Sequence, residues 1–237
     1  MDLRLVIIAV TPAIALALAF YLTDRFDREP MRLLTKVFVF GALSVIPIVI
    51  VGRFLVSLNI FTGLLGIAFT TFIIAGLTEE FFKREVVLRI AYKNPAFDEK
   101  LDGIIYAVFA SLGFATVENI MYVLTHFSSN PYVGIYRGLL SVPAHALLGV
   151  TMGYYLSLAK FSINSNFERV YLRRALLVPA FLHGVFNFIL MADISILLVL
   201  FIPYVIYLWF TNLKKLNHYY RESKTRLQSR ETDYTLE

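Results

Sequence analysis

Long apolar runs separated by short polar connections recur along the whole chain. A helix needs about 20 mostly apolar residues to cross the hydrocarbon core of a bilayer. All the runs are expected to be helical, because a strand or loop facing lipid would leave backbone polar groups without partners. The pattern predicts seven spans: Leu5–Leu22, Val37–Leu58, Gly63–Ile90, Gly103–Leu124, Gly138–Leu158, Ala175–Met191 and Ile194–Phe210. The third is long and polar in its second half, so it reads either as one tilted helix or as two shorter ones, which would make eight spans.

Composition supports this class. Of the 237 residues 58% are apolar and 16% are charged, whereas about a quarter of a soluble domain is charged. The fold class is therefore an all-α, polytopic transmembrane bundle. The chain has no cysteine, which excludes disulfides, thiolate metal sites and a cysteine nucleophile. The net charge of +5 does not indicate nucleic acid binding, because the basic residues lie between apolar runs and not on a soluble domain.

The positions of lysine and arginine predict the orientation. Basic residues gather in alternate connections, after the first, third and fifth spans, and in the C-terminal segment. Such segments usually face the cytoplasm, so the N-terminus is expected outside and the C-terminus inside. The first span is expected to be retained and not cleaved as a signal peptide, because its basic cluster follows it. We expect a membrane domain over residues 1–212 and a basic cytoplasmic tail over 213–237.

Four polar patches interrupt the apolar spans. Charged side chains at membrane depth cost a few kcal/mol each and usually mark function. The first patch holds Glu79, Glu80 and Lys83, and the lysine is three or four residues from either carboxylate, within reach on a helix. Successive helical residues diverge by about 100°, so the two carboxylates are not expected to point at one spot. A structural ion pair where the helix leaves the membrane is the alternative, because Arg84, Glu85 and Arg89 follow closely.

The second patch is Glu118 and Asn119 in "GFATVENIMY". Its surroundings are apolar on both sides, so an exit from the membrane does not explain it. A buried glutamate there is expected to be neutral or paired. A structural hydrogen bond between helices is the alternative.

The other two patches contain histidine. His145 precedes Gly149 and Gly153, whose four-residue spacing predicts close helix packing. His183 and Asn187 are one turn apart on one helical face. A lone buried histidine is more often a packing residue than a ligand. Taken together, however, the four patches predict a water-holding cavity suited to acid–base catalysis, a metal site or a proton relay.

The patches also resemble known motifs. "EEFFK", "FATVEN", "HALLG" and "HGVFN" occur here in the order typical of the PrsW family of bacterial intramembrane proteases, which are distant relatives of the CAAX prenyl endopeptidases. "YLTDRFDREP" and "FDEKLDGIIYAVFASLGFATVEN" are similar to further segments of that family. The resemblance runs from about residue 10 to residue 212.

This resemblance implies a multi-pass protease of the bacterial cell membrane. Its substrate would be a membrane-anchored anti-sigma factor, and its cut would be the first in a cascade that frees an extracytoplasmic-function sigma factor. By position, the functional residues would be Glu79, Glu80, Glu118, His145 and His183, supported by Lys83, Asn119 and Asn187. The prenyl endopeptidases carry a histidine where this chain has Glu118, so their residue roles do not transfer one to one.

The expected mechanism needs no metal. Glu79 or Glu80 would act as general base on a trapped water, and Lys83 would keep one carboxylate ionised. His145 or His183, with Asn187, would donate hydrogen bonds to the oxyanion. Glu118 and Asn119 would position the water or the substrate backbone. Both histidines fall near mid-bilayer and Glu118 nearer the outer face, so closing the site requires tilted or irregular helices.

Three alternatives remain open from the sequence. Two histidines and a glutamate also match a catalytic zinc site, although no H-E-x-x-H motif fixes their spacing. A non-catalytic membrane scaffold or chaperone would tolerate Glu→Gln changes wherever it still folds. A proton-coupled transporter would show paired broken helices in two halves, and no such repeat is visible.

Overall fold

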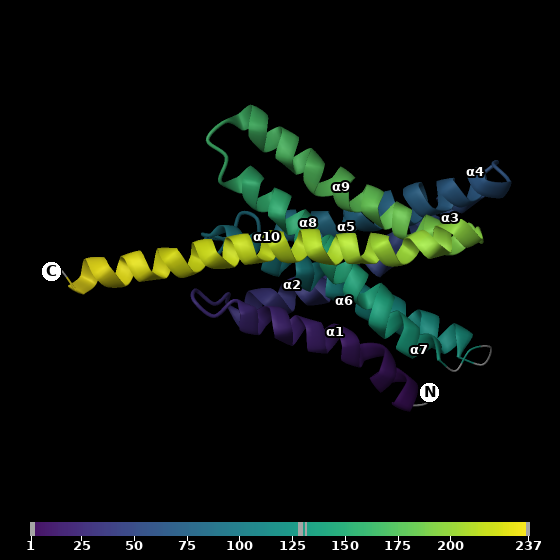
Figure 1. The fold of residues 1–237 in the computed structure, drawn as a ribbon, viewed down its shortest axis with the longest axis horizontal. Coiled ribbons are helices and arrows are strands. Elements are labelled where there is room, and N and C mark those ends of the chain that lie inside the picture. Colours follow the sequence, from purple (N-terminus) through teal and green to yellow (C-terminus); the bar gives the residue numbers. More distant parts are fainter. Residues whose placement is uncertain (1–2, 128–129, 131, 236–237) are drawn as a thin grey trace.

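A computed structural model describes residues 3–127, 130 and 132–235, and this part of the chain is helical, with no strand (Figure 1). Two elements, η1 and η2, are π-helical. In chain order the elements are α1 (Leu3–Thr23), α2 (Met31–Leu43), α3 (Val45–Ser57), α4 (Gly63–Ala68), η1 (Phe69–Glu79), α5 (Glu80–Ile90), α6 (Lys100–His126), α7 (Val133–Tyr136), η2 (Arg137–Ser141), α8 (Val142–Lys160), α9 (Ser165–Met191) and α10 (Ser195–Thr235).

Seven helical stretches of the described residues are long and apolar enough to cross a membrane. They are α1, α2–α3, α4–η1–α5, α6, α7–η2–α8, α9 and the first part of α10. The predicted all-α bundle with seven spans is confirmed, and the third span, Gly63–Ile90, is one continuous helix and not two. The two termini lie at opposite ends of the bundle (Figure 1). Which end faces the cytoplasm stays a prediction.

Helix α6 forms the centre of the bundle. It packs against α8, α2 and α1, and nearly every residue of its first five turns is buried. The contact with α8 is close because glycines meet there: a Cβ at Gly153 would collide with the backbone of Gly103 and of Ile104. The predicted small-residue packing surface on α8 is therefore confirmed.

The π-helical segments provide the helix irregularity that the different predicted depths of the histidines and Glu118 required. In η1, the hydroxyl of Thr78 donates to the carbonyl of Ile73 five residues earlier, at 2.9 Å, which matches the wider π-helical turn. In the fifth span, Pro143 has no backbone N–H, and η2 ends two residues before it. Segment η1 ends at Glu79, and segment η2 begins at Arg137.

Helix α10 continues without a break through residue 212, so the division into a membrane domain and a tail stays a prediction. Its distal part returns to the start of α6. Lys100 contacts Glu222 at 2.6 Å, and Arg226 contacts Asp98 at 3.3 Å. We refer to this side of the bundle, which also holds the connection at residues 24–30, as the predicted cytoplasmic end.

Candidate active site

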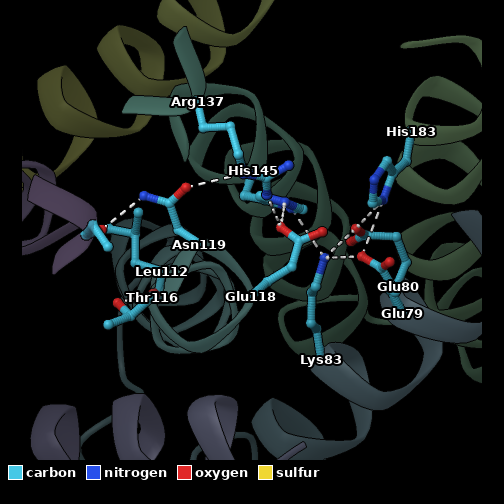
Figure 2. A network of polar contacts seen from close by, with 11 residues as sticks. Glu79, Glu80, Lys83, Leu112, Thr116, Glu118, Asn119, Arg137, His145 and His183 are labelled. Atoms are coloured by element: carbon cyan, nitrogen blue, oxygen red, sulfur yellow. Dashed lines mark hydrogen bonds and ion pairs between the residues drawn. The ribbon is translucent and has the colours of Figure 1, made fainter. Parts of the chain in front are cut away.

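Side chains from η1–α5, α6, α8 and α9 converge inside the bundle (Figure 2). All five residues predicted as catalytic take part, together with the predicted supporting lysine. We call the group the acid–imidazole cluster; it consists of Glu79, Glu80, Lys83, Glu118, His145 and His183.

Glycines allow these helices to approach. A Cβ at Gly76, one turn before Glu79, would crowd the backbone carbonyl of Ala180 on α9. A Cβ at Gly184 would in turn overlap the ring of Phe72 on η1. Because neither Cβ exists, η1 and α9 pack closely enough for the glutamate pair to reach His183.

Lys83 lies at the middle of the cluster and is fully buried. Its Nζ contacts Glu79 Oε2 at 3.4 Å, Glu80 Oε1 at 2.8 Å and His145 Nδ1 at 3.2 Å. The expectation that the two carboxylates point to different places is therefore wrong. Both side chains are long and flexible, and they bend from adjacent backbone positions toward the same ammonium (Figure 2).

The two carboxylates differ in how firmly they are held. Glu80 is fully buried, and its Oε1 also lies 3.0 Å from His183 Nδ1. Glu79 Oε2 has only the longer contacts, 3.4 Å to Lys83 and 3.8 Å to the same imidazole nitrogen. Glu79 is therefore the more loosely engaged carboxylate, although its side chain is only 11% exposed.

The partners of His145 define which ring nitrogen carries hydrogen. An ammonium can only donate, so Nδ1 of His145 accepts from Lys83. Nε2 then carries the hydrogen and donates to Glu118 Oε2, 3.0 Å away. The ring of His145 also packs edge-on against that of His183, with centroids 5.2 Å apart. Both imidazoles are thus held in fixed orientations by carboxylates from other helices.

One residue of this network was missed by the sequence reasoning. Arg137 Nη2 donates to Glu118 Oε2 at 2.6 Å, and its Nε donates to Asn119 Oδ1 at 2.9 Å. An arginine at the end of a predicted outer span usually has only an orienting role. The available signal was that Arg137 stands in a connection with few other basic residues.

The two predicted supporting asparagines occupy different surroundings. Asn119 is fully buried, and its amide also donates to the carbonyl of Ala9 on α1 at 2.8 Å, so it faces away from the histidines. Asn187 is half-buried, and no described residue makes a hydrogen bond with its amide. Their catalytic roles stay predictions.

Glu79, His145 and His183 each offer one ligand atom, and these three atoms lie within 4.8 Å of one another. No other group of three such residues is found in the described part of the chain. Two imidazoles and one carboxylate form a known catalytic zinc ligand set. Glu118 and Glu80 each hold one ring nitrogen of a histidine, as carboxylates commonly do beside zinc. The donor set therefore fits a metal ion.

Comparison with known proteins gives a consistent result. Residues 29–211 match the family model described as "PrsW family intramembrane metalloprotease". The chain is 42% identical to "Protease PrsW" of Clostridioides difficile (strain 630) over 225 residues, which is 94% of each chain. It is 38% identical to "Protease PrsW" of Bacillus subtilis (strain 168) over 206 residues, which is 87% of this chain and 91% of that one. No solved structure matches.

Proposed function

Since the chain belongs to the PrsW family and is an intramembrane protease, we propose that it cleaves a membrane-anchored anti-sigma factor at the acid–imidazole cluster. The family resemblance of its motifs supports the substrate class. The cluster supports the place of the reaction, because carboxylates and imidazoles converge there from four separate helices that are long and apolar enough to cross a membrane.

Charge balance supports Glu79 as the carboxylate that takes part in the reaction. The cluster has three carboxylates, whereas among the described residues two permanent cations, Lys83 and Arg137, contact them. Glu80 is held tightly by Lys83, and Glu118 by Arg137. The remaining carboxylate attracts a proton or a cation. We assign Glu79 to take a proton from the attacking water and to return it to the leaving amine.

The hydrogen bonds change the expected source of the oxyanion donor. In its neutral form each histidine has one ring N–H, and these lie beside Glu118 and Glu80. The unengaged amide of Asn187 lies one turn after His183 on α9. We therefore assign the hydrogen bond to the oxyanion to Asn187. The other ring nitrogen of each histidine carries a lone pair, and in His145 this lone pair accepts from Lys83.

Those lone pairs support the zinc alternative to the metal-free mechanism expected from the sequence. Glu79, His145 and His183 would hold the ion, and Glu79 would then be a ligand and not the base. Zinc would supply Lewis acidity and a more acidic water. The buried Lys83 ammonium favours the metal-free alternative, because it occupies contacts with two of these three residues.

The direct test uses purified protein reconstituted with candidate anti-sigma factors, with fragment masses as the readout. We expect Glu79→Gln to lower the cleavage rate at least about 1,000-fold while the protein remains inserted and folded. Glu85→Gln is the matched control, because Glu85 lies on the same helical stretch but pairs with Arg84 and Arg89 outside the cluster. Full activity of Glu79→Gln would refute this assignment.

Metal content distinguishes the two mechanisms. We expect about one zinc per wild-type chain by elemental analysis, a loss of activity with a chelator, and recovery when zinc is restored. His183→Gln should not retain the metal. Undiminished cleavage by protein that contains no metal would support the metal-free mechanism.

A further inference from the structure

Arg137 begins η2, and its side chain reaches across to the central helix α6. Its guanidinium contacts two consecutive α6 residues, Glu118 through Nη2 and Asn119 through Nε. It also lies over the ring of Tyr122, 4.3 Å from the centroid. A planar guanidinium can make these separate contacts at once, whereas a lysine ammonium is a single compact charge. The side chain is only 15% exposed, so solvent screens these contacts weakly.

The local fold directs Arg137 inward. Helix α7 and η2 pack on α1: a Cβ at Gly134 would crowd Ile8, and a Cβ at Gly138 would crowd the ring of Pro12. Asn119 ties the same region together, because it accepts from Arg137 and donates to the carbonyl of Ala9 on α1. Three spans therefore fix the guanidinium beside Glu118.

One oxygen of Glu118 connects this arrangement to the site. Oε2 accepts from Arg137 at 2.6 Å and from Nε2 of His145 at 3.0 Å. The Glu118 side chain is 30% exposed, more than that of His145 or of Glu79. Without the guanidinium, this carboxylate would lose the closer of its two hydrogen-bond partners. Lys83 does not replace it, since its hydrogen bonds go to Glu79, Glu80 and His145.

We propose that Arg137 is a positioning residue that clamps Glu118, so that Glu118 holds His145 with hydrogen on Nε2 and its Nδ1 lone pair turned into the cluster. Arg137 acts through Glu118 and does not touch the reacting atoms. The kinetic consequence of this clamp rests on the proposed function, whereas the state of the imidazole ring does not.

The kinetic test separates kcat from KM in reconstituted protein. We expect Arg137→Gln to lower kcat about 10- to 100-fold, as removal of supporting partners does at comparable sites, with KM changed less than about threefold. Arg137→Lys should not restore kcat, because an ammonium cannot hold Glu118 and Asn119 together. Arg53→Gln, which changes an exposed arginine on α3, is the control and should behave as wild type.

A double variant tests the route of the effect. If Arg137 acts through Glu118, then Arg137→Gln combined with Glu118→Gln should be no slower than Glu118→Gln alone. A multiplicative loss, or an Arg137→Gln enzyme with at least half the wild-type kcat, would overturn the proposal. Thermal melting of each variant shows whether a lost activity reflects misfolding.

A second measurement does not require activity. The protein has four histidines, so nitrogen-15 labelling of histidine gives few NMR signals, and His145→Gln identifies the signals of His145. We expect hydrogen on Nε2 of His145 in the wild type. In Arg137→Gln, Lys83 still donates to Nδ1, so we expect the same tautomer but a faster exchange of the Nε2 hydrogen with water, because Glu118 no longer holds it firmly. Hydrogen on Nδ1 in the wild type, or an unchanged exchange rate in the variant, overturns the proposal. If wild-type protein cleaves nothing, the proposed function fails while this spectrum still decides the role of Arg137.

Discussion

Two buried groups of carboxylates lie in different parts of the bundle, and different partners compensate their charges. In the acid–imidazole cluster, Lys83 bridges carboxylates of η1–α5 and the imidazole of His145 on α8, and Arg137, from η2, holds Glu118 and Asn119 of α6. The second group, which we call the carboxylate cluster, lies at the predicted cytoplasmic end and consists of Asp24, Glu29, Glu99 and Asp102. Each of its members is at most 6% exposed.

The carboxylate cluster is held mainly by neutral donors. Asp102 Oδ2 accepts from the backbone N–H of Glu99 at 2.7 Å, and Asp24 Oδ2 accepts from that of Glu29 at 3.0 Å. Tyr106 donates to Glu29, and the carboxyl groups of Glu29 and Asp102 lie near one another. Two carboxyl groups that are buried together favour a proton on one of them. The comparison teaches that fixed cations balance two of the three carboxylates in the acid–imidazole cluster, whereas protons help to balance the carboxylate cluster.

The largest effect is expected when the central cation is removed. Lys83→Met would leave Glu79 and Glu80 buried without their shared ammonium. Breaking a buried ion pair on one side costs about 3–5 kcal/mol, so we expect a strongly lowered melting temperature and no cleavage. Lys100→Met is the control, because Lys100 makes a partly exposed pair with Glu222.

A second substitution should restore part of the stability that Lys83→Met loses. Combining Lys83→Met with Glu80→Gln removes both partners of the shortest ion pair, and we expect part of the lost stability to return, since no unpaired charge then remains at that contact. A Lys83→Met protein that melts like the wild type would mean that this lysine does not compensate the carboxylates.

The carboxylate cluster should respond to pH. Burial raises the pKa of Glu29 from its ordinary value of 4.5 to about 8, and the nearby Asp24 carboxylate contributes to the rise. Burial likewise raises the pKa of Asp24, to about 6. Between about pH 4.5 and pH 8 the folded protein therefore binds more protons than the unfolded chain. The free energy of unfolding is highest below this range and falls as the pH rises toward 8.

We expect a fall of about 2–4 kcal/mol in the free energy of unfolding from pH 5 to pH 8, seen as a falling melting temperature in detergent. Glu29→Gln should flatten this dependence, because an amide has no proton to lose. Glu222→Gln, at a partly exposed carboxylate on α10, should leave the slope unchanged. An equally steep slope in Glu29→Gln would assign the dependence to other groups.

The sequence was sufficient for the features that depend on composition and local spacing. Apolar length predicted seven spans, and the rarity of charge at membrane depth singled out Glu79, Glu80, Glu118, His145 and His183, which the fold brings together. The family was confirmed by comparison.

The features that were missed depend on contacts between distant segments. Arg137 meets Asn119 and Glu118 only because α7 and η2 dock on α1. The two adjacent glutamates contact the same ammonium, and this could be found only from the position of Lys83 in three dimensions. The motifs "YLTDRFDREP" and "FDEKLDG" were visible as family-like segments, but nothing in either one indicated that their carboxyl groups meet.

The smallest effect is expected for a single neutral donor in the carboxylate cluster. Tyr106→Phe removes the hydrogen bond to Glu29, and a hydrogen bond of this kind contributes about 1 kcal/mol. That bond lowers the pKa of Glu29 against the effect of burial, so it favours the ionised carboxylate. The loss in melting temperature should therefore be greater at pH 8.5 than at pH 5.5. Tyr207→Phe, on an exposed position of α10, should show no such difference. An equal loss for Tyr106→Phe at both pH values would indicate that the tyrosine contributes packing alone and that protonation of Glu29 does not depend on it.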